Sequence, residues 1–138
     1  MKLQYNVYYN LKYGLDNCDY ETGGILGGTN NAISHFVFDK SVVNKNIYTY
    51  KPNTDYLNSK ILLWDRMGID FLGMFHSHIV GGTEPSFADL KYFERLILNT
   101  TGKTLYFIII HPKKELSLYK GIITNSKLSI KKELIELF

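Results

Sequence analysis

The sequence predicts an α/β fold in which a mixed β-sheet carries helices on both faces. Helical and strand-like patterns alternate along the chain, which is typical of a sheet covered by helices. An uninterrupted apolar run at residues 105–110 indicates a strand buried on both faces. With 138 residues and a hydrophobic content of 45%, the chain is long enough to bury one core, so we expect a single domain over residues 1–138.

Apolar spacing and end signals predict the helices. Val7, Leu11 and Leu15 stand four residues apart, as on one face of a helix. A similar pattern follows Thr54 and meets Gly68, a residue type that commonly ends helices. The expected helices are, in order, 5–18, 54–67 and 87–100, the last one stopping near Gly102.

Alternating or continuous apolar runs predict the strands. Residues 33–43 alternate between two faces and follow a turn at 29–31, so we expect them to pair back on residues 23–28. The polar, tyrosine-rich stretch 44–54 contains Pro52 and is expected to be a loop or an edge strand. The expected strands are, in order, 23–28, 33–43, 69–75, 105–110, 116–124 and a last one from residue 128 that continues into a short helix or tail by 138.

Charge and cysteine content exclude several classes of protein. The net charge of +3 is spread along the chain without a basic stripe, so we expect no nucleic-acid partner. The single cysteine, Cys18, excludes an intrachain disulfide framework and fits a reducing compartment. No apolar run approaches the length of a transmembrane helix, and the N-terminus lacks a signal-peptide core. We therefore expect a cytoplasmic protein with no membrane association.

The stretch 73–89, GMFHSHIVGGTEPSFAD, is where potential metal ligands cluster. His76 and His78 are two residues apart, so their side chains share one face only if they lie on a strand. Ser86 is expected to cap the next helix, which places Asp89 in the first turn and returns its carboxylate toward the strand end. This ligand set suits one zinc ion with a position left for water, and cobalt, iron or manganese could bind it as well.

An open coordination position is what a catalytic metal site requires. Zinc lowers the pKa of its water to about 7 and polarises a carbonyl group. Such a bound water is the expected nucleophile. The cluster at residues 76–89 does not itself supply a base.

The arrangement H-x-H, seven residues, S, two residues, D resembles the signature of the JAMM metalloproteases, also called the MPN+ or JAB-domain family. That family carries an upstream glutamate in an E-T/S-G-G-I-L-G context, and residues 21–27 read ETGGILG. The resemblance covers nearly the whole chain and implies a three-layer αβα, cytidine-deaminase-like fold with zinc at His76, His78 and Asp89. Many relatives have proline after the second histidine, where this chain has Ile79, a difference that concerns the loop and not the ligands.

The resemblance also implies roles for Glu21 and Ser86. Glu21 would take a proton from the attacking water and pass it to the leaving amine. Ser86 would hydrogen-bond the tetrahedral oxyanion or the water. The structural alternatives are a surface ion pair or a charge at a helix C-terminus for Glu21, and a helix cap alone for Ser86. Three aromatic residues are expected to be packing or surface side chains, with a contribution to binding left open: Tyr48, Tyr50 and Trp64.

The substrate implied by the resemblance is the peptide or isopeptide bond after the C-terminal Gly-Gly of ubiquitin or a ubiquitin-like protein, whose tail would bind as an added strand. The compact chain resembles prokaryotic stand-alone, deubiquitinase-like isopeptidases. Such enzymes remove modifiers, including in antiphage conjugation systems, or trim sulfur-carrier precursors, and the sequence does not distinguish these tasks. The alternative is a zinc-containing scaffold that binds such a tail beside a partner subunit without cutting it.

Overall fold

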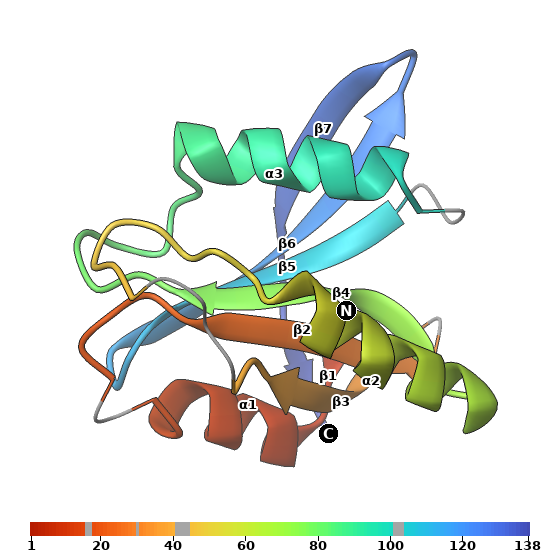
Figure 1. Cartoon of the computed structure of the whole chain (residues 1–138), viewed down its shortest axis with the longest axis horizontal. Helices are drawn as coiled ribbons and strands as arrows, with labels where there is room; N and C mark the ends of the chain where they lie inside the picture. Colours follow the sequence, from red (N-terminus) through yellow and green to blue (C-terminus); the bar gives the residue numbers. More distant parts are fainter. Residues whose placement is uncertain (16–17, 30, 41–44, 101–103) are drawn as a thin grey trace.

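The computed structural model describes residues 1–15, 18–29, 31–40, 45–100 and 104–138. This part of the chain forms one curled sheet with flanking helices (Figure 1). The helices are α1 (Tyr5–Tyr13), α2 (Thr54–Arg66) and α3 (Phe87–Leu98). The strands are β1 (Lys2–Leu3), β2 (Gly23–Thr29), β3 (Ala32–Phe38), β4 (Asp70–Ser77), β5 (Thr104–His111), β6 (Glu115–Thr124), β7 (Lys127–Glu133) and β8 (Glu136–Leu137). Among the described residues, no helix is long and apolar enough to cross a membrane.

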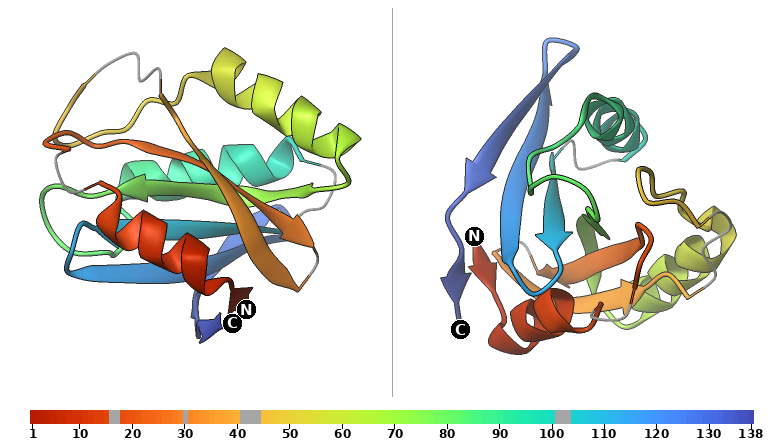
Figure 2. Two further views of the ribbon diagram at one scale, coloured as in Figure 1. Left: turned by 90° about the horizontal axis from the view of Figure 1, so that it is seen from below. Right: turned by 90° about the vertical axis from the view of Figure 1, so that its left-hand side faces the viewer.

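The described strands form a mixed sheet in the order β7-β6-β5-β4-β2-β3-β1-β8. β4 and β5 pair in parallel, β1 pairs in parallel with both β3 and β8, and the other neighbours are antiparallel. The C-terminal segment supplies both edges, since β7 pairs with β6 and β8 pairs with β1. The sheet therefore curls until its two edges are connected by one short segment, and the chain ends lie close together (Figure 2).

Alternation along the strands divides the core into two clusters, one on each face of the sheet. On β5, Ile108 and Ile110 belong to the cluster under α1, while Phe107 and Ile109 belong to the cluster under α2 and α3. The helices contribute their buried faces to these clusters: Val7 and Leu11 from α1, Leu57 and Trp64 from α2, and Phe93 and Ile97 from α3. The predicted mixed sheet between helices is confirmed.

Most predicted elements are present with shifted ends. The first helix ends at Tyr13 and not at residue 18, with Gly14 as the C-cap residue, whose N–H donates to the Asn10 carbonyl. The second strand ends at Phe38, and the remainder of its predicted range at 41–43 lies outside the described residues, as do positions 30 and 102. Residues 45–53 form a loop, which decides between the two alternatives for that stretch.

The short helix or tail expected at the end of the last strand is wrong. After β7 the chain forms a further strand, β8, in which Leu137 lies opposite Leu3 of β1. Ile135 packs against the cluster under α1. Ile135 and Leu137 stand two apart, which is the period of a strand. The partner strand β1 has only two residues, so the sequence offered no visible neighbour for this segment.

Gly73 lets β4 approach β5 closely in the centre of the sheet. Its φ of 152° lies in a region that L side chains rarely adopt. A Cβ atom at this position would overlap the carbonyl oxygen of Tyr106, with which Gly73 is paired in register. Any side chain here would push β4, which carries the first of the two candidate histidines, away from β5.

We expect Gly73→Ala to lower the free energy of unfolding by about 3 kcal/mol or more, because the clash involves backbone atoms that cannot move independently. Gly82→Ala is the matched control, since a Cβ there would only approach the flexible Glu115 carboxylate at 3.4 Å. It should change stability by less than about 1 kcal/mol. Urea denaturation measures both variants, and equal stability of the two would contradict this account of β4.

Candidate metal centre

The C-terminal end of β4 carries the two predicted histidine ligands. His76 lies within β4 and pairs with Gly23 of β2, and His78 follows directly after the last strand residue. The His78 N–H donates to the Ile110 carbonyl at 2.8 Å, so pairing with β5 continues through it. Both residues are buried, with 8% and 7% of their surface exposed. Their Nε2 atoms lie 3.1 Å apart, which confirms that the two imidazoles converge.

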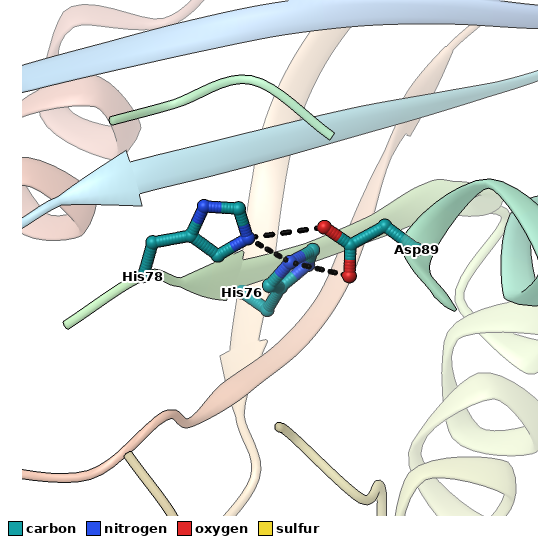
Figure 3. Close-up of side chains that lie close together, drawn as sticks. All are labelled: His76, His78 and Asp89. Atoms are coloured by element: carbon teal, nitrogen blue, oxygen red, sulfur yellow. Dashed lines mark hydrogen bonds and ion pairs between the residues drawn. The ribbon is translucent and has the colours of Figure 1, made fainter. Parts of the chain in front are cut away.

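Asp89 meets these histidines from the first turn of α3. The Ser86 Oγ accepts the Asp89 N–H at 3.0 Å, and the Asp89 carboxylate accepts the Ser86 N–H at 2.9 Å. This capping box turns the carboxylate back toward β4. Its Oδ1 lies 3.2 Å from His76 Nε2, and its Oδ2 lies 3.0 Å from His78 Nε2 (Figure 3).

The separations among these groups fit a tetrahedral metal ion. At metal–ligand distances of about 2.0–2.1 Å, tetrahedral ligand atoms lie about 3.3 Å from one another. The closest contacts here are 3.0 to 3.2 Å, and all three ligand atoms lie within 4.8 Å of one another. Two imidazoles and one carboxylate are also a donor set found in catalytic zinc sites. His76, His78 and Asp89 could therefore hold one metal ion.

The hydrogen bonds and charges of the cluster favour a cation. The Nδ1 of His78 donates to the Gly82 carbonyl at 2.8 Å, which directs its Nε2 toward the other ligands. Burial alone would lower the pKa of His78, but contacts with Asp89 and Gly82 raise it overall. Burial also opposes ionisation of Asp89, yet hydrogen bonds from the two histidines hold its pKa well below the usual range. The space between the Asp89 carboxylate and the two imidazoles therefore favours a positive charge.

The loop after His78, residues 79–85, is anchored by side chains from β5 and β6. The Tyr119 hydroxyl donates to the carbonyl of the buried Thr83 at 2.7 Å. The Nδ1 of His111 donates to the carbonyl of residue 81 at 2.8 Å. These contacts hold the loop in place although it begins with Ile79 and lacks the proline that many relatives have there. They also support the carbonyl that orients His78.

A cleft of about 210 Å³ opens beside two of the three candidate ligands, His76 and Asp89. Its lining includes His76 of β4, residues 48–50 of the loop before α2, and Ser86, Asp89 and Tyr92 at the start of α3. The Ser86 Oγ uses an acceptor position for its cap, so its O–H can still donate to a ligand. Helix capping and ligand binding therefore do not exclude each other at this hydroxyl.

Glu21 lies just before β2 and is only 5% exposed, so the alternative of a surface ion pair does not describe it. Its N–H donates to the Asn46 carbonyl at 2.7 Å. Burial raises the pKa of Glu21 from 4.5 to about 7, while the charge of His78 opposes the shift and that of Asp89 adds to it. Glu21 does not line the cleft described above. Its connection to the cluster is electrostatic, through His78 and Asp89.

Ser77 ties the Glu21 segment to β4, a contact that the sequence did not predict. Its side chain is completely buried. Its N–H donates to the Thr22 carbonyl at 2.8 Å, and its Oγ accepts the Thr22 N–H at 3.1 Å. Ser77 therefore binds both the N–H and the carbonyl of Thr22, the residue after Glu21. The available signal was a hydroxyl at a core-facing strand position, where a polar group needs a partner.

Comparison with known families identifies the class of protein. The profile described as prokaryotic homologs of the JAB domain matches residues 12–120. The chain belongs to this family, as the resemblance in its motifs predicted. All five candidate site residues lie within the matched range: Glu21, His76, His78, Ser86 and Asp89. No curated protein matches the sequence.

Solved structures share the fold. A protein from Desulfitobacterium hafniense has a TM-score of 0.72 at 17% identity, with 99% of this chain and 92% of that chain covered. A JAB1/MPN domain protein from Archaeoglobus fulgidus has a TM-score of 0.58 at 19% identity, with 99% and 98% covered. A protein from Salinibacter ruber has a TM-score of 0.61 at 17% identity, with 98% and 90% covered. At these identities the likeness establishes the fold and not the activity.

We expect Glu21→Gln to stabilise the metal-free protein at pH 8 but not at pH 4.5. Because the pKa of Glu21 is raised in the folded state, the folded protein binds more protons than the unfolded chain between pH 4.5 and about 7. Its contribution to stability is complete below this window and is lost as the pH rises through it. Glutamine does not titrate, so the variant escapes this loss of stability, which is worth up to about 3 kcal/mol at pH 8.

Thermal unfolding in the presence of a chelator, at several pH values, measures the difference between variant and unaltered chain. Glu136→Gln, which removes an exposed carboxylate, is the matched control. A stability difference for Glu21→Gln that stays constant from pH 4.5 to pH 8 would show that Glu21 is not held in a desolvated position.

Proposed function

We propose that this chain is a zinc-dependent peptidase or isopeptidase that cleaves after the C-terminal Gly-Gly of ubiquitin or a ubiquitin-like protein. The observation that carries the proposal is the convergence of His76, His78 and Asp89 beside a cleft, with a buried Glu21 coupled to them. Membership of the JAB family supports the reaction class. When bound, a zinc ion would polarise the scissile carbonyl and lower the pKa of a coordinated water to about 7.

The side chains of the site divide the remaining work. Glu21 takes a proton from the attacking water and passes it to the leaving amine, so that one carboxylate serves both transfers. The Ser86 O–H donates to the carbonyl oxygen as negative charge develops there, while its oxygen continues to cap α3. His78 stays oriented by the Gly82 carbonyl throughout.

The tail of the ubiquitin-like protein enters along the cleft between residues 48–50 and α3. We expect its backbone to pair as an added strand, which places few demands on side chains. This mode of binding suits the removal of modifiers, including in an antiphage conjugation system, and equally the trimming of a sulfur-carrier precursor.

The test is zinc content together with cleavage of ubiquitin and ubiquitin-like fusions by the unaltered chain and by Glu21→Ala. We expect one zinc per chain in both proteins. Cleavage after Gly-Gly should fall by about 10² to 10⁴ in the variant, because one general base contributes a factor of that size. A variant that cuts as fast as the unaltered chain would refute the role of Glu21.

Substitution of a ligand provides the metal control. His76→Ala and Asp89→Ala should lose zinc, whereas His35→Ala removes an exposed histidine of β3 and should retain it. If the unaltered protein binds no zinc, the metal centre is wrong. If it binds zinc and a ubiquitin-like tail but cuts nothing, the non-cleaving scaffold replaces the peptidase.

We expect Ser86→Ala to lower kcat by about 10² to 10³ through loss of an oxyanion donor. The same change removes the α3 cap, which should lower the free energy of unfolding by only about 1 kcal/mol. Ser86→Thr keeps a hydroxyl in the same place and should retain most activity and stability. Steady-state kinetics and urea denaturation separate the two effects. A variant that loses stability but keeps its kcat would reduce Ser86 to a helix cap.

A further inference from the structure

We propose that Tyr50 is a positioning residue of the metal centre and sets the size of the side chain that the cleft accepts next to the scissile bond. Its effect on His76 depends only on the contacts described below. Its effect on substrate choice rests on the proposed function. Tyr50 lies outside both sequence motifs of the site, in the loop between β3 and α2.

The Tyr50 ring lies nearly parallel to the imidazole of His76. The two ring planes differ by 22°, and their centroids are 6.5 Å apart. The Phe93 ring of α3 contacts the same imidazole, with centroids 6.2 Å apart. Aromatic rings from two different elements therefore pack against His76, and they restrict rotation of its imidazole away from Asp89.

Tyr50 also packs directly on the backbone of β2. A Cβ atom at Gly23 would lie 2.6 Å from Cε2 of Tyr50, so the ring occupies the space that any side chain at Gly23 would need. Gly23 pairs in register with His76. The ring thus covers the point where β2 and β4 meet beside the ligands, which gives one physical reason for glycine at this place in the ETGGILG motif.

A buried carboxylate fixes the ring from the other end. Asp39 is 4% exposed, and its Oδ2 accepts hydrogen bonds from the Tyr50 hydroxyl and from the Asn53 N–H, both at 2.8 Å. The Asp39 N–H donates to the Gly23 carbonyl at 2.8 Å. The Asn53 side chain in turn caps α2. Tyr50 is therefore held by β2, by the segment after β3 and by the start of α2.

This anchoring makes Tyr50 a rigid part of the cleft lining opposite Ser86 and Asp89. A peptide whose carbonyl reaches the ligands must pass between these walls. The cleft lined by the phenol ring and by α3 has a volume of only about 210 Å³, which the peptide backbone and any side chain beside it would have to share. We therefore expect Tyr50 to enforce glycine at the residue that supplies the scissile carbonyl.

The effect on the metal centre is tested with cobalt in place of zinc, because the visible absorption of bound cobalt reports the geometry of its ligands. Tyr50→Ala should change this spectrum and weaken cobalt binding by about 2- to 10-fold, the range expected for loss of one aromatic contact. Tyr50→Phe keeps the ring but loses the hydrogen bond to Asp39, so it should change the spectrum and the affinity much less than Tyr50→Ala does. Tyr9→Ala and Tyr9→Phe, at an exposed position of α1, are the matched controls. Unchanged spectrum and affinity in Tyr50→Ala would overturn the positioning role.

The effect on substrate choice is tested with ubiquitin fusions that end in glycine, alanine or leucine before the scissile bond. Tyr50→Ala should raise the rate on alanine relative to glycine by about 10-fold over the ratio of the unaltered chain. Tyr50→Phe should leave the ratio unchanged. A ratio that Tyr50→Ala does not alter would overturn the role in selectivity.

The two measurements separate failure of this inference from failure of the proposed function. If the unaltered chain binds cobalt but cuts no fusion, the proposed function fails and the cobalt spectra still decide the role of Tyr50. If it cuts fusions and Tyr50→Ala behaves like the unaltered chain, only this inference fails. Should Tyr50→Ala not fold, Tyr50→Leu covers Gly23 without an aromatic ring and takes its place in both experiments.

Discussion

The capping box at the start of α3 determines the direction of the Asp89 carboxylate, and the candidate site depends on that direction. The same oxygen accepts the Ser86 N–H and faces the His78 imidazole. A carboxylate used for a helix cap alone would remain in solvent, whereas here it reaches a strand end that already carries two buried histidines. The helix cap directs the Asp89 carboxylate, and strand pairing fixes the two histidines that it contacts. Together they bring three candidate ligands from two separate parts of the chain around one point.

The central strands of the sheet fix the backbone that carries the two histidines and Glu21. Gly73 permits close approach of β4 to β5, and pairing of β4 with β2 brings the Glu21 segment to the histidines, where Ser77 holds it. The anchored loop after His78 then supplies the carbonyl that orients its imidazole. The backbone of each residue that the proposed function uses is therefore fixed by a neighbouring strand or helix. Electrostatic catalysis requires this preorganisation of the catalytic groups.

Spacing rules predicted the parts of the site that depend on neighbouring residues in sequence. The two-residue repeat placed both histidines on one face, and the cap placed Asp89, because strand period and helix capping are local properties. Contacts between distant segments left no such signal. The hydrogen bond from the Tyr50 hydroxyl to Asp39 and the pairing of the short strands β1 and β8 arise only when the sheet is complete. The substrate could not be predicted from spacing either. The spacing of the residues predicts the metal ligands, but it does not predict the peptide tail that binds beside them.

The most direct measurement is a crystal structure of the zinc-loaded protein, or X-ray absorption at the zinc edge. The account predicts one zinc ion bound by the Nε2 atoms of His76 and His78 and by one oxygen of Asp89, at distances of about 2.0–2.2 Å, with a fourth ligand that is not a protein side chain. A fourth protein ligand that closes the coordination shell, or zinc bound elsewhere on the chain, would contradict the account.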